Sequence, residues 1–384
     1  MKAVDGITLN GRFFSRQWIL HHFENLRSPE FTPDEILTLT FCGQWLSGQT
    51  SFTVQTSGST GPAKPVRIER AQMALSARLT GQALDLKRGD RALVCLSPAH
   101  IGGIMMLVRG FELSLHLTVV EPSSNPFERL EEFDQDLRVS LDFTAMVPLQ
   151  LQQVLDSKKK YRNLLNQMKA ILIGGAPISV ALLQQLLAVK APVYHTFGMT
   201  ETVSHIALRP LNGAAASDAF RPLPGVKVGT DHRGCLTIES AITGGKRVVT
   251  NDLVEILQDH RFVWLGRVDN VINSGGIKVQ AEKVEKALEE VLLELGKEWD
   301  YKRAFFIGPL PHANLGEEVI AFFEGARFPS DRQKRIRALL SSKLSKYEVP
   351  RRFCFVDSFL RTENGKIDRR ATLLNISVVG RDYE

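Results

Sequence analysis

The sequence predicts an α/β fold with a large N-terminal domain of mainly parallel sheets and helices, a β-rich subdomain, and a small α+β C-terminal domain. Three successive patterns in the 384 residues lead to this prediction. Short apolar runs first alternate with helical patterns, then Gly-rich turns separate closely spaced strands, and finally strands occur with an acidic and a basic helix. Each pattern is typical of a different packing arrangement.

The first pattern occupies about residues 50–200. Helical patterns such as 70–86 and 177–187 separate its apolar runs, which are SFTVQT, VRIE, RALVCL, HLTVVE, FTAMV, KAILI and PVYHTF. Strands that alternate with helices of this length predict a largely parallel sheet. Since ligands bind at the carboxyl ends of the strands in such sheets, the loops directly after these runs are candidate sites.

The other two patterns divide the rest of the chain. GVKVGTDHRGCLTIES and RVVTNDLVEIL predict a β-rich subdomain at about residues 210–266. The acidic helix Ala281–Leu295, the strand RAFFIG and the basic helix Ser330–Lys346 predict a separate α+β domain. We therefore expect an N-terminal domain at 1–266, a hinge at 267–270 and a C-terminal domain at 271–384.

The formal charge of +6 argues for small polyanionic ligands rather than for nucleic acid. Lysine and arginine are spread along the chain, and the tight basic run is Lys158–Lys160, which is too short for a nucleic-acid-binding patch. A mild positive balance still attracts anionic small molecules. The composition does not decide between a monomer and a homodimer.

The four cysteines indicate a reducing compartment. Cys42, Cys95, Cys235 and Cys354 are far apart and show no metal-binding spacing, so we expect reduced, mostly buried thiols and a cytoplasmic protein. The N-terminal residues lack the apolar core of a signal peptide, and glycine and proline interrupt the most apolar stretch, 171–187. We therefore expect no membrane insertion.

A phosphate-binding loop is predicted between two strand-like runs. Its sequence, Thr56-Ser57-Gly58-Ser59-Thr60-Gly61-Pro62-Ala63-Lys64, offers hydroxyls, close backbone N–H groups and a positive charge. The spacing is not that of a Walker A loop. A flexible Ser/Gly surface turn would have the same composition, so this loop alone does not decide the function.

Two further segments follow apolar runs. Thr200 and Glu201 could place a hydroxyl on a phosphate and a carboxylate on Mg²⁺, although the same pair often caps a helix. Gly174-Gly175-Ala176 could admit a flat ring against the backbone, or only turn the chain.

Asp252 could accept the two hydroxyls of a ribose, whereas Lys366 alone would be an ordinary surface charge.

Taken together and in order, these segments resemble the adenylate-forming superfamily of acyl-CoA synthetases, peptide-synthetase adenylation domains and luciferases. The motifs that carry the resemblance are TSGSTGPAK, GGAPIS, YHTFGMTET, ND, WLGRVDNVINSGGIKV and RTENGKIDRR, which cover residues 56–370. The resemblance implies a mobile C-terminal domain, ATP, Mg²⁺ and coenzyme A as ligands, and a two-step reaction through an acyl-adenylate.

The resemblance also implies a role for each matching residue. Lys366 bridges acid and phosphate, Thr200 holds the α-phosphate, Glu201 holds Mg²⁺, Asp269 is the hinge, and His100 lies near the carboxylate. The implied ATP-binding residues are Thr56, Ser57, Gly58, Ser59, Thr60, Gly61, Lys64, Gly174, Gly175, Ala176, Tyr194, His195, Thr196, Phe197, Asp252 and Arg267. The implied coenzyme A tunnel is Ser274, Gly275 and Gly276, and the expected acid pocket is His100, Gly102, Gly103, Gly198, Ser204 and His205.

The chain departs from the family pattern in three places. It has fewer residues before the phosphate loop than is usual, Ala63 replaces a proline, and Asn251 replaces a glycine. We expect Asn251 to be tolerated because asparagine accepts a left-handed backbone.

We expect Gly102 and Gly103 to leave room for an aromatic ring in the acid pocket.

The segment 198–207 is similar to that of the compact o-succinylbenzoate:CoA ligases of menaquinone biosynthesis. This similarity implies an acid substrate with two carboxylates. The second carboxylate then needs a donor or cation in the pocket, and Ser204 and His205 are the expected polar contacts. Another aryl or acyl acid, an adenylation enzyme that loads a carrier protein, and a non-catalytic nucleotide-binding relative remain alternatives.

Overall fold

The structure is a computed structural model that describes residues 5–55, 64–296, 303–362 and 366–379. The chain packs as two units. The first unit consists of Met1–Gly229, Thr237–Val248 and Ile256–Val263, and the second consists of Thr230–Leu236, Val249–Glu255 and Trp264–Glu384. The long C-terminal part of the second unit thus begins just before the predicted hinge.

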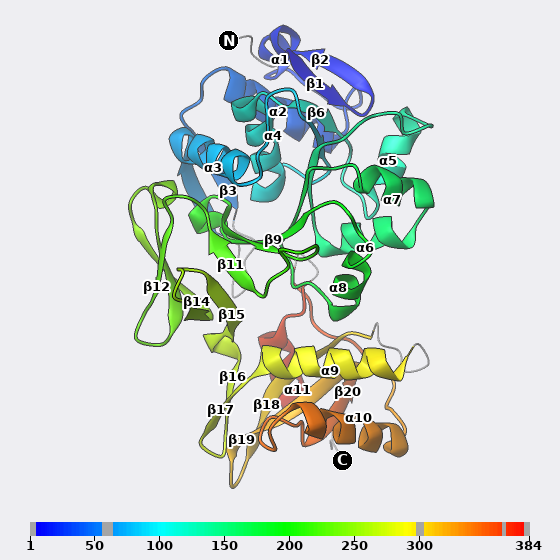
Figure 1. Ribbon diagram of the computed structural model, residues 1–384, viewed down its shortest axis with the longest axis vertical. Helices are drawn as coiled ribbons and strands as arrows, with labels where there is room; N and C mark the ends of the chain where they lie inside the picture. Colours follow the sequence, from blue (N-terminus) through cyan, green and yellow to red (C-terminus); the bar gives the residue numbers. More distant parts are fainter. Residues whose placement is uncertain (1–4, 56–63, 297–302, 363–365, 380–384) are drawn as a thin grey trace. The chain divides into compact units, whose positions relative to one another are not determined.

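A mainly parallel sheet forms the centre of the first unit, as the sequence predicts (Figure 1). Its strands are β1 (Gly6–Leu9), β2 (Arg12–Ser15), β5 (Arg91–Val94), β6 (His116–Val119), β7 (Phe143–Met146), β8 (Ala170–Ile173), β9 (Val193–Gly198), β10 (His205–Pro210) and β11 (Ala219–Pro222). Their order is β11-β10-β9-β8-β7-β5-β6-β1-β2. The pairs from β9 to β1 are parallel, whereas β2, β10 and β11 add antiparallel edges.

Helices cover both faces of this sheet, because adjacent strand residues point to opposite sides. Val94 packs with helices α2 (Pro33–Leu46), α3 (Arg70–Ala83) and α4 (Ile101–Leu113). Its neighbour Leu93 packs with α5 (Pro126–Phe133), α6 (Pro148–Asp156), α7 (Lys159–Leu165) and α8 (Val180–Leu186). Burial on both faces explains why these strands read as continuous apolar runs in the sequence.

Two elements lie outside this arrangement. Strands β3 (Ser51–Gln55) and β4 (Pro65–Glu69) are the predicted strands on either side of the phosphate loop, and they form a separate antiparallel ribbon. Helix α1 (Arg16–His22) follows β2. The pattern analysis did not anticipate that the first residues would contribute β1 and β2 to the central sheet.

The Gly-rich region forms strands, as predicted, but its residues are shared between the two units. The strands are β12 (Lys227–Thr230), β13 (Cys235–Glu239), β14 (Arg247–Ile256) and β15 (Phe262–Arg267). Phe262 of β15 pairs with Phe220 of β11, and their stacked ring centroids are 5.4 Å apart. The sequence analysis had grouped this region with the N-terminal domain as one subdomain.

The second unit is an α+β domain. Its strands β16 (Val271–Ser274), β17 (Ile277–Gln280), β18 (Phe305–His312), β19 (Gly316–Glu324) and β20 (Arg352–Val356) form a mixed sheet. Helices α9 (Ala281–Leu295) and α10 (Ser330–Lys343) pack on one apolar cluster and α11 (Arg369–Val379) on another. Helix α9 matches the predicted range, whereas α10 ends earlier because Leu344 adopts an extended conformation.

The cysteines agree with the sequence analysis, since all four are buried free thiols. Among the described residues, the helices are too short or too polar for a membrane-spanning segment.

Candidate functional site

The loop after β8 carries the predicted adenine-binding glycines. A Cβ atom on Gly174 would lie 2.2 Å from Thr196 Oγ1, so a larger residue cannot occupy this position without displacing β9. Gly175 has a φ of +82°, which favours glycine. The backbone of this loop is therefore open at the carboxyl edge of the sheet, where ligands bind in such folds.

Strand β9 supplies the second predicted part of the adenine site. His195 is neutral because burial, together with the nearby Arg209, lowers its pKa to about 3. The same ring bonds to the backbone of Ala176, which joins the strand to the glycine loop. Phe197 packs edge-on against Phe262 with ring centroids 5.1 Å apart. These contacts fix the predicted adenine-site residues in the first unit relative to one another.

Thr200 and Glu201 lie in a 3₁₀ turn, Thr200–Thr202, directly after β9. Thr200 is buried, while Glu201 is exposed and has no hydrogen-bond or ion-pair partner in the described parts of the chain. No group of three or more His, Cys, Asp or Glu side chains among the described residues could hold a metal ion. One exposed carboxylate still fits Mg²⁺, which often takes one protein oxygen together with substrate phosphates and water.

The turn from β9 into β10 is sterically tight. A Cβ atom on Gly198 would lie 2.2 Å from the carbonyl oxygen of Ser204. Val203 has a φ of +64°, a strained conformation for a β-branched residue. Gly198 therefore serves the close approach of the two strands, and the strained turn sets the positions of Ser204 and His205.

Ser204 and His205 belong to a buried polar cluster that includes a residue the sequence analysis missed. Arg109, on α4, donates from Nη2 to Ser204 Oγ at 2.9 Å and lies 3.4 Å from His205 Nδ1. His205 Nε2 lies 3.1 Å from Thr80 Oγ1, and that hydroxyl donates to the carbonyl of Ser76. A neutral His205 that accepts from Arg109 and donates to Thr80 satisfies this chain of contacts.

Arg109 is a buried cation whose hydrogen-bond partners are neutral. Its exposed fraction is 2%, and within the described ranges no carboxylate forms an ion pair with it. Burial lowers the pKa of Arg109 to about 10, and its Nε atom is buried without a hydrogen-bond partner. Burial and the adjacent Arg109 also lower the pKa of His205 well below its ordinary value. An unpaired buried charge is costly unless an anionic partner binds it.

The segment before Arg109 only partly matches its predicted role. His100 begins α4 and is exposed, so it can reach a ligand. A Cβ atom on Gly103 would lie 2.3 Å from the carbonyl of Ser97, which shows that backbone already occupies this space. The absence of a side chain at Gly103 is thus required by the nearby backbone, and its place in the acid pocket stays a prediction. Gly102 is less confined, with Leu96 Cδ1 at 3.3 Å from an added Cβ.

In the second unit, Asp252 is held by Trp264. The indole Nε1 donates to Asp252 Oδ1 at 3.0 Å, and the backbone N–H of Asp252 donates to Thr250 Oγ1. Asp252 is largely buried, which keeps the carboxylate in one orientation. Its second oxygen can accept a hydroxyl hydrogen, as the ribose role requires.

The predicted hinge residue Asp269 lies in a short polar network of the second unit. Arg267 Nη2 donates to Asp269 Oδ2 at 2.8 Å, and Asn251 Nδ2 lies 3.2 Å from the same oxygen. Arg233 donates to the Asn251 side-chain oxygen at 3.1 Å. Asn251 lies in strand β14 and not in a left-handed conformation, so its expected tolerance has a different cause: its side chain bonds to both neighbours.

The remaining predicted residues of the second unit lie on two turns. Ser274 pairs with Ile277, so Gly275 and Gly276 form a two-residue hairpin turn with φ values of +59° and +80°. Positive φ at both positions is the reason for two glycines. Lys366 is exposed, and its carbonyl accepts a hydrogen bond from the backbone of Thr362 at 2.8 Å.

The structure thus brings several predicted residues together within each unit. The residues assembled at the end of β9 in the first unit are Gly174, Ala176, His195, Thr196, Thr200, Ser204 and His205. Those connected in the second unit are Arg267 and Asp269. The phosphate-loop residues 56–63 lie outside the described residues, and Lys64 is described and exposed.

The chain is similar to known proteins over most of its length. A family model described as AMP-binding enzyme matches residues 46–233. A solved structure from Dyadobacter fermentans DSM 18053, an acyl-CoA synthetase (AMP-forming)/AMP-acid ligase II-like protein, is 42% identical, with a TM-score of 0.59, and the match covers 92% of this chain and 97% of that one.

Two further similar proteins are named for succinylbenzoate. A 2-succinylbenzoate–CoA ligase of Lactococcus lactis is 25% identical over 83% of this chain and 69% of that protein. An o-succinylbenzoate coenzyme A synthetase of Bacillus subtilis, solved in complex with ATP and a magnesium ion, is 19% identical, with a TM-score of 0.67, over 94% of this chain and 82% of that one. The latter similarity supports the fold.

Proposed function

Because the chain belongs to the AMP-binding enzyme family of AMP-forming ligases, we propose that it joins o-succinylbenzoate to coenzyme A through an acyl-adenylate. The family supplies the general reaction. The substrate rests on one observation, the buried and unpaired Arg109 beside Ser204 and His205.

In the first step, the substrate carboxylate attacks the α-phosphorus of ATP, and pyrophosphate leaves. Positioning and charge neutralisation carry such a step, since no protein nucleophile is required. Thr200 donates to the α-phosphate, and Lys366 neutralises charge between the acid and the phosphate. Mg²⁺, held by Glu201, would neutralise the phosphate oxygens.

In this proposal, each unit supplies its own set of groups for a different part of the nucleotide. The backbone at Gly174–Ala176 and the face of β9 accept adenine, and the neutral His195 keeps the loop against the strand. Asp252, already oriented by Trp264, accepts from the ribose hydroxyls, and Arg267 donates to them.

In the second step, the thiol of coenzyme A attacks the acyl carbonyl, and AMP leaves. We assign Asp269 as the hinge about which the C-terminal domain rotates between the two steps. In this proposal the rotation withdraws Lys366 and brings forward the turn Ser274–Gly276, whose glycines have the positive φ values that the tight turn requires.

The substrate has a second carboxylate, which Arg109 is suited to bind. A carboxylate beside Arg109 would gain a charge-assisted hydrogen bond and would end the isolation of the buried cation. Ser204 adds a hydroxyl, and His205 stays neutral, so it holds the guanidinium without competing for the anion. A simple aliphatic acid or benzoate lacks the second carboxylate and would leave Arg109 unpaired.

A panel of acids in a pyrophosphate-release assay tests the proposal. We expect o-succinylbenzoate to have a kcat/KM far above those of benzoate and a medium-chain fatty acid. Comparable turnover of benzoate would refute the substrate and leave the ligase reaction in place. A carrier-loading enzyme would form acyl-AMP without responding to free coenzyme A, and a non-catalytic relative would release no pyrophosphate.

A further inference from the structure

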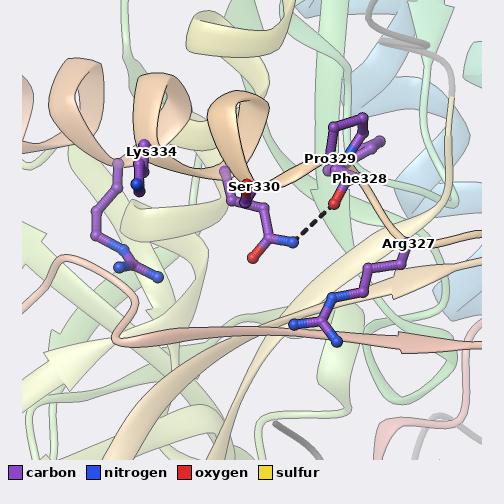
Figure 2. A pocket seen from close by; sticks show the side chains of 7 residues that line it. Arg327, Phe328, Pro329, Ser330 and Lys334 are labelled. Carbon is purple, nitrogen blue, oxygen red and sulfur yellow. Dashed lines mark hydrogen bonds between the residues drawn. The ribbon is translucent and has the colours of Figure 1, made fainter.

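A basic depression lies at the start of α10 in the second unit. Its volume is about 500 Å³, which is in the range of small-molecule sites. Figure 2 shows Arg327 and Lys334 on either side of Ser330, where the helix begins. The lining residues are Arg327, Phe328, Pro329, Ser330, Gln333, Lys334 and Arg337. No part of the proposed reaction uses this depression.

The depression gathers three positive side chains, and Asp331, the acidic residue in the first turn of α10, is not among the residues that line it. Arg327, Lys334 and Arg337 line it, and no carboxylate does. In the portions of the chain that the structure describes, none of the three forms an ion pair, whereas Lys343 at the end of the same helix pairs with two glutamates. Like charges that converge repel one another, so this arrangement favours a bound anion.

The depression also offers hydrogen-bond donors. Arg337 lines the depression and carries a guanidinium with several N–H donors, of which the Nε atom is itself shielded from solvent. Helix α10 has no side-chain cap at its start, so its first N–H groups lack that partner, and the helix dipole favours negative charge there, part of which Asp331 supplies. Gln333 donates to the carbonyl of Phe328 at 2.8 Å, which holds the entering segment in place (Figure 2).

We propose that this depression binds the phosphate groups of a small anionic ligand, and that coenzyme A is their source. A planar guanidinium, an ammonium group and free helix N–H groups together match phosphate oxygens. Phe328 and Pro329 add an apolar surface next to the cations. The choice of coenzyme A rests on the proposed function, whereas the phosphate chemistry rests on the depression alone.

Titration calorimetry on the full chain tests this proposal. The test variant is Arg327→Ala/Lys334→Ala, and the matched control is Arg332→Ala/Arg335→Ala, which removes the same charge from the same region outside the depression. The probes are coenzyme A, inorganic pyrophosphate and ATP. We expect the Kd for coenzyme A to rise at least ~10-fold in the test variant and to change less than ~2-fold in the control, with the difference shrinking at high salt.

The outcomes separate the two parts of the proposal. If pyrophosphate binding weakens but coenzyme A binding does not, the phosphate site stands and coenzyme A is refuted as its source. If both probes bind the test variant as they bind the wild type, the proposal is overturned. A chain that activates no acid would refute the proposed function, and the binding result would still decide whether this site exists.

Discussion

Replacing Arg109 by methionine should improve stability and remove substrate selectivity. Burial lowers the pKa of Arg109 from its ordinary value to about 10, so the folded chain disfavours the protonated form. At ~1.36 kcal/mol per pKa unit, this is a cost of roughly 3 kcal/mol. The cost is fully present below a pH of about 10 and disappears above the pKa of the unfolded chain, so it applies at neutral pH.

Methionine removes this cost but also removes the hydrogen bonds to Ser204 and His205, each worth about 1 kcal/mol. We therefore expect the free energy of unfolding to stay the same or to rise by up to about 2 kcal/mol. The kcat/KM for o-succinylbenzoate should fall by about 100-fold or more, since a buried charge-assisted contact is worth several kcal/mol. Activity with benzoate should change little.

Thermal unfolding and pyrophosphate release measure the two effects. The control is Arg78→Met on α3, an exposed arginine that pairs with Glu112 and should affect neither selectivity nor stability strongly. Arg109→Lys keeps the charge and loses the planar fork, so it should retain part of the selectivity. A variant Arg109→Met that unfolds easily yet still prefers o-succinylbenzoate would refute this reasoning.

Three other predictions concern different parts of the molecule. Lys366→Ala should lower acyl-AMP formation by about 100-fold or more while supplied acyl-AMP is still converted to thioester; equal losses in the two half-reactions would contradict the assigned role. Asp269→Pro should impair thioester formation more than adenylation, and wild-type rates in both single-turnover assays would show that the hinge lies elsewhere. Gly198→Ala should destabilise the fold by about 3 kcal/mol or more, because the added Cβ would lie 2.2 Å from the carbonyl oxygen of Ser204. The control is Gly213→Ala, which has open space around it and should cost about 1 kcal/mol because its φ is +71°. If the denaturant unfolding curves of the two glycine variants coincided, the steric argument would be disproved.

The pattern of apolar runs was sufficient to predict most of the fold. Strands β7 and β8 are buried at every residue and β5 at all but its first, so their sequences are mostly apolar and easy to locate, whereas β9 is buried only at Val193. Helix α9 was placed correctly because Val284, Leu288 and Val291 recur on one face. Strands β1 and β2 were missed although Asn10-Gly11 between them is a local hairpin signal, whereas the pairing of β1 with β6 joins segments distant in the sequence.

The site was harder to predict because its key contacts are tertiary. Arg109 lies in a mainly apolar helix, where a cation next to Met105, Met106 and Gly110 is a signal in the sequence itself. Asn251 was judged from backbone tolerance, whereas its side-chain contact with Asp269 spans 18 residues. Spacing predicted the candidate residues, and the packing shows what they contact.

The most direct test of the central claim is product analysis by mass spectrometry. The full chain is incubated with o-succinylbenzoate, ATP and Mg²⁺, first without and then with coenzyme A. We predict acyl-AMP and pyrophosphate in the first reaction, and conversion of that acyl-AMP to o-succinylbenzoyl-CoA and one equivalent of AMP in the second. Formation of ADP and phosphate, or acyl-AMP that persists when coenzyme A is added, would contradict the account.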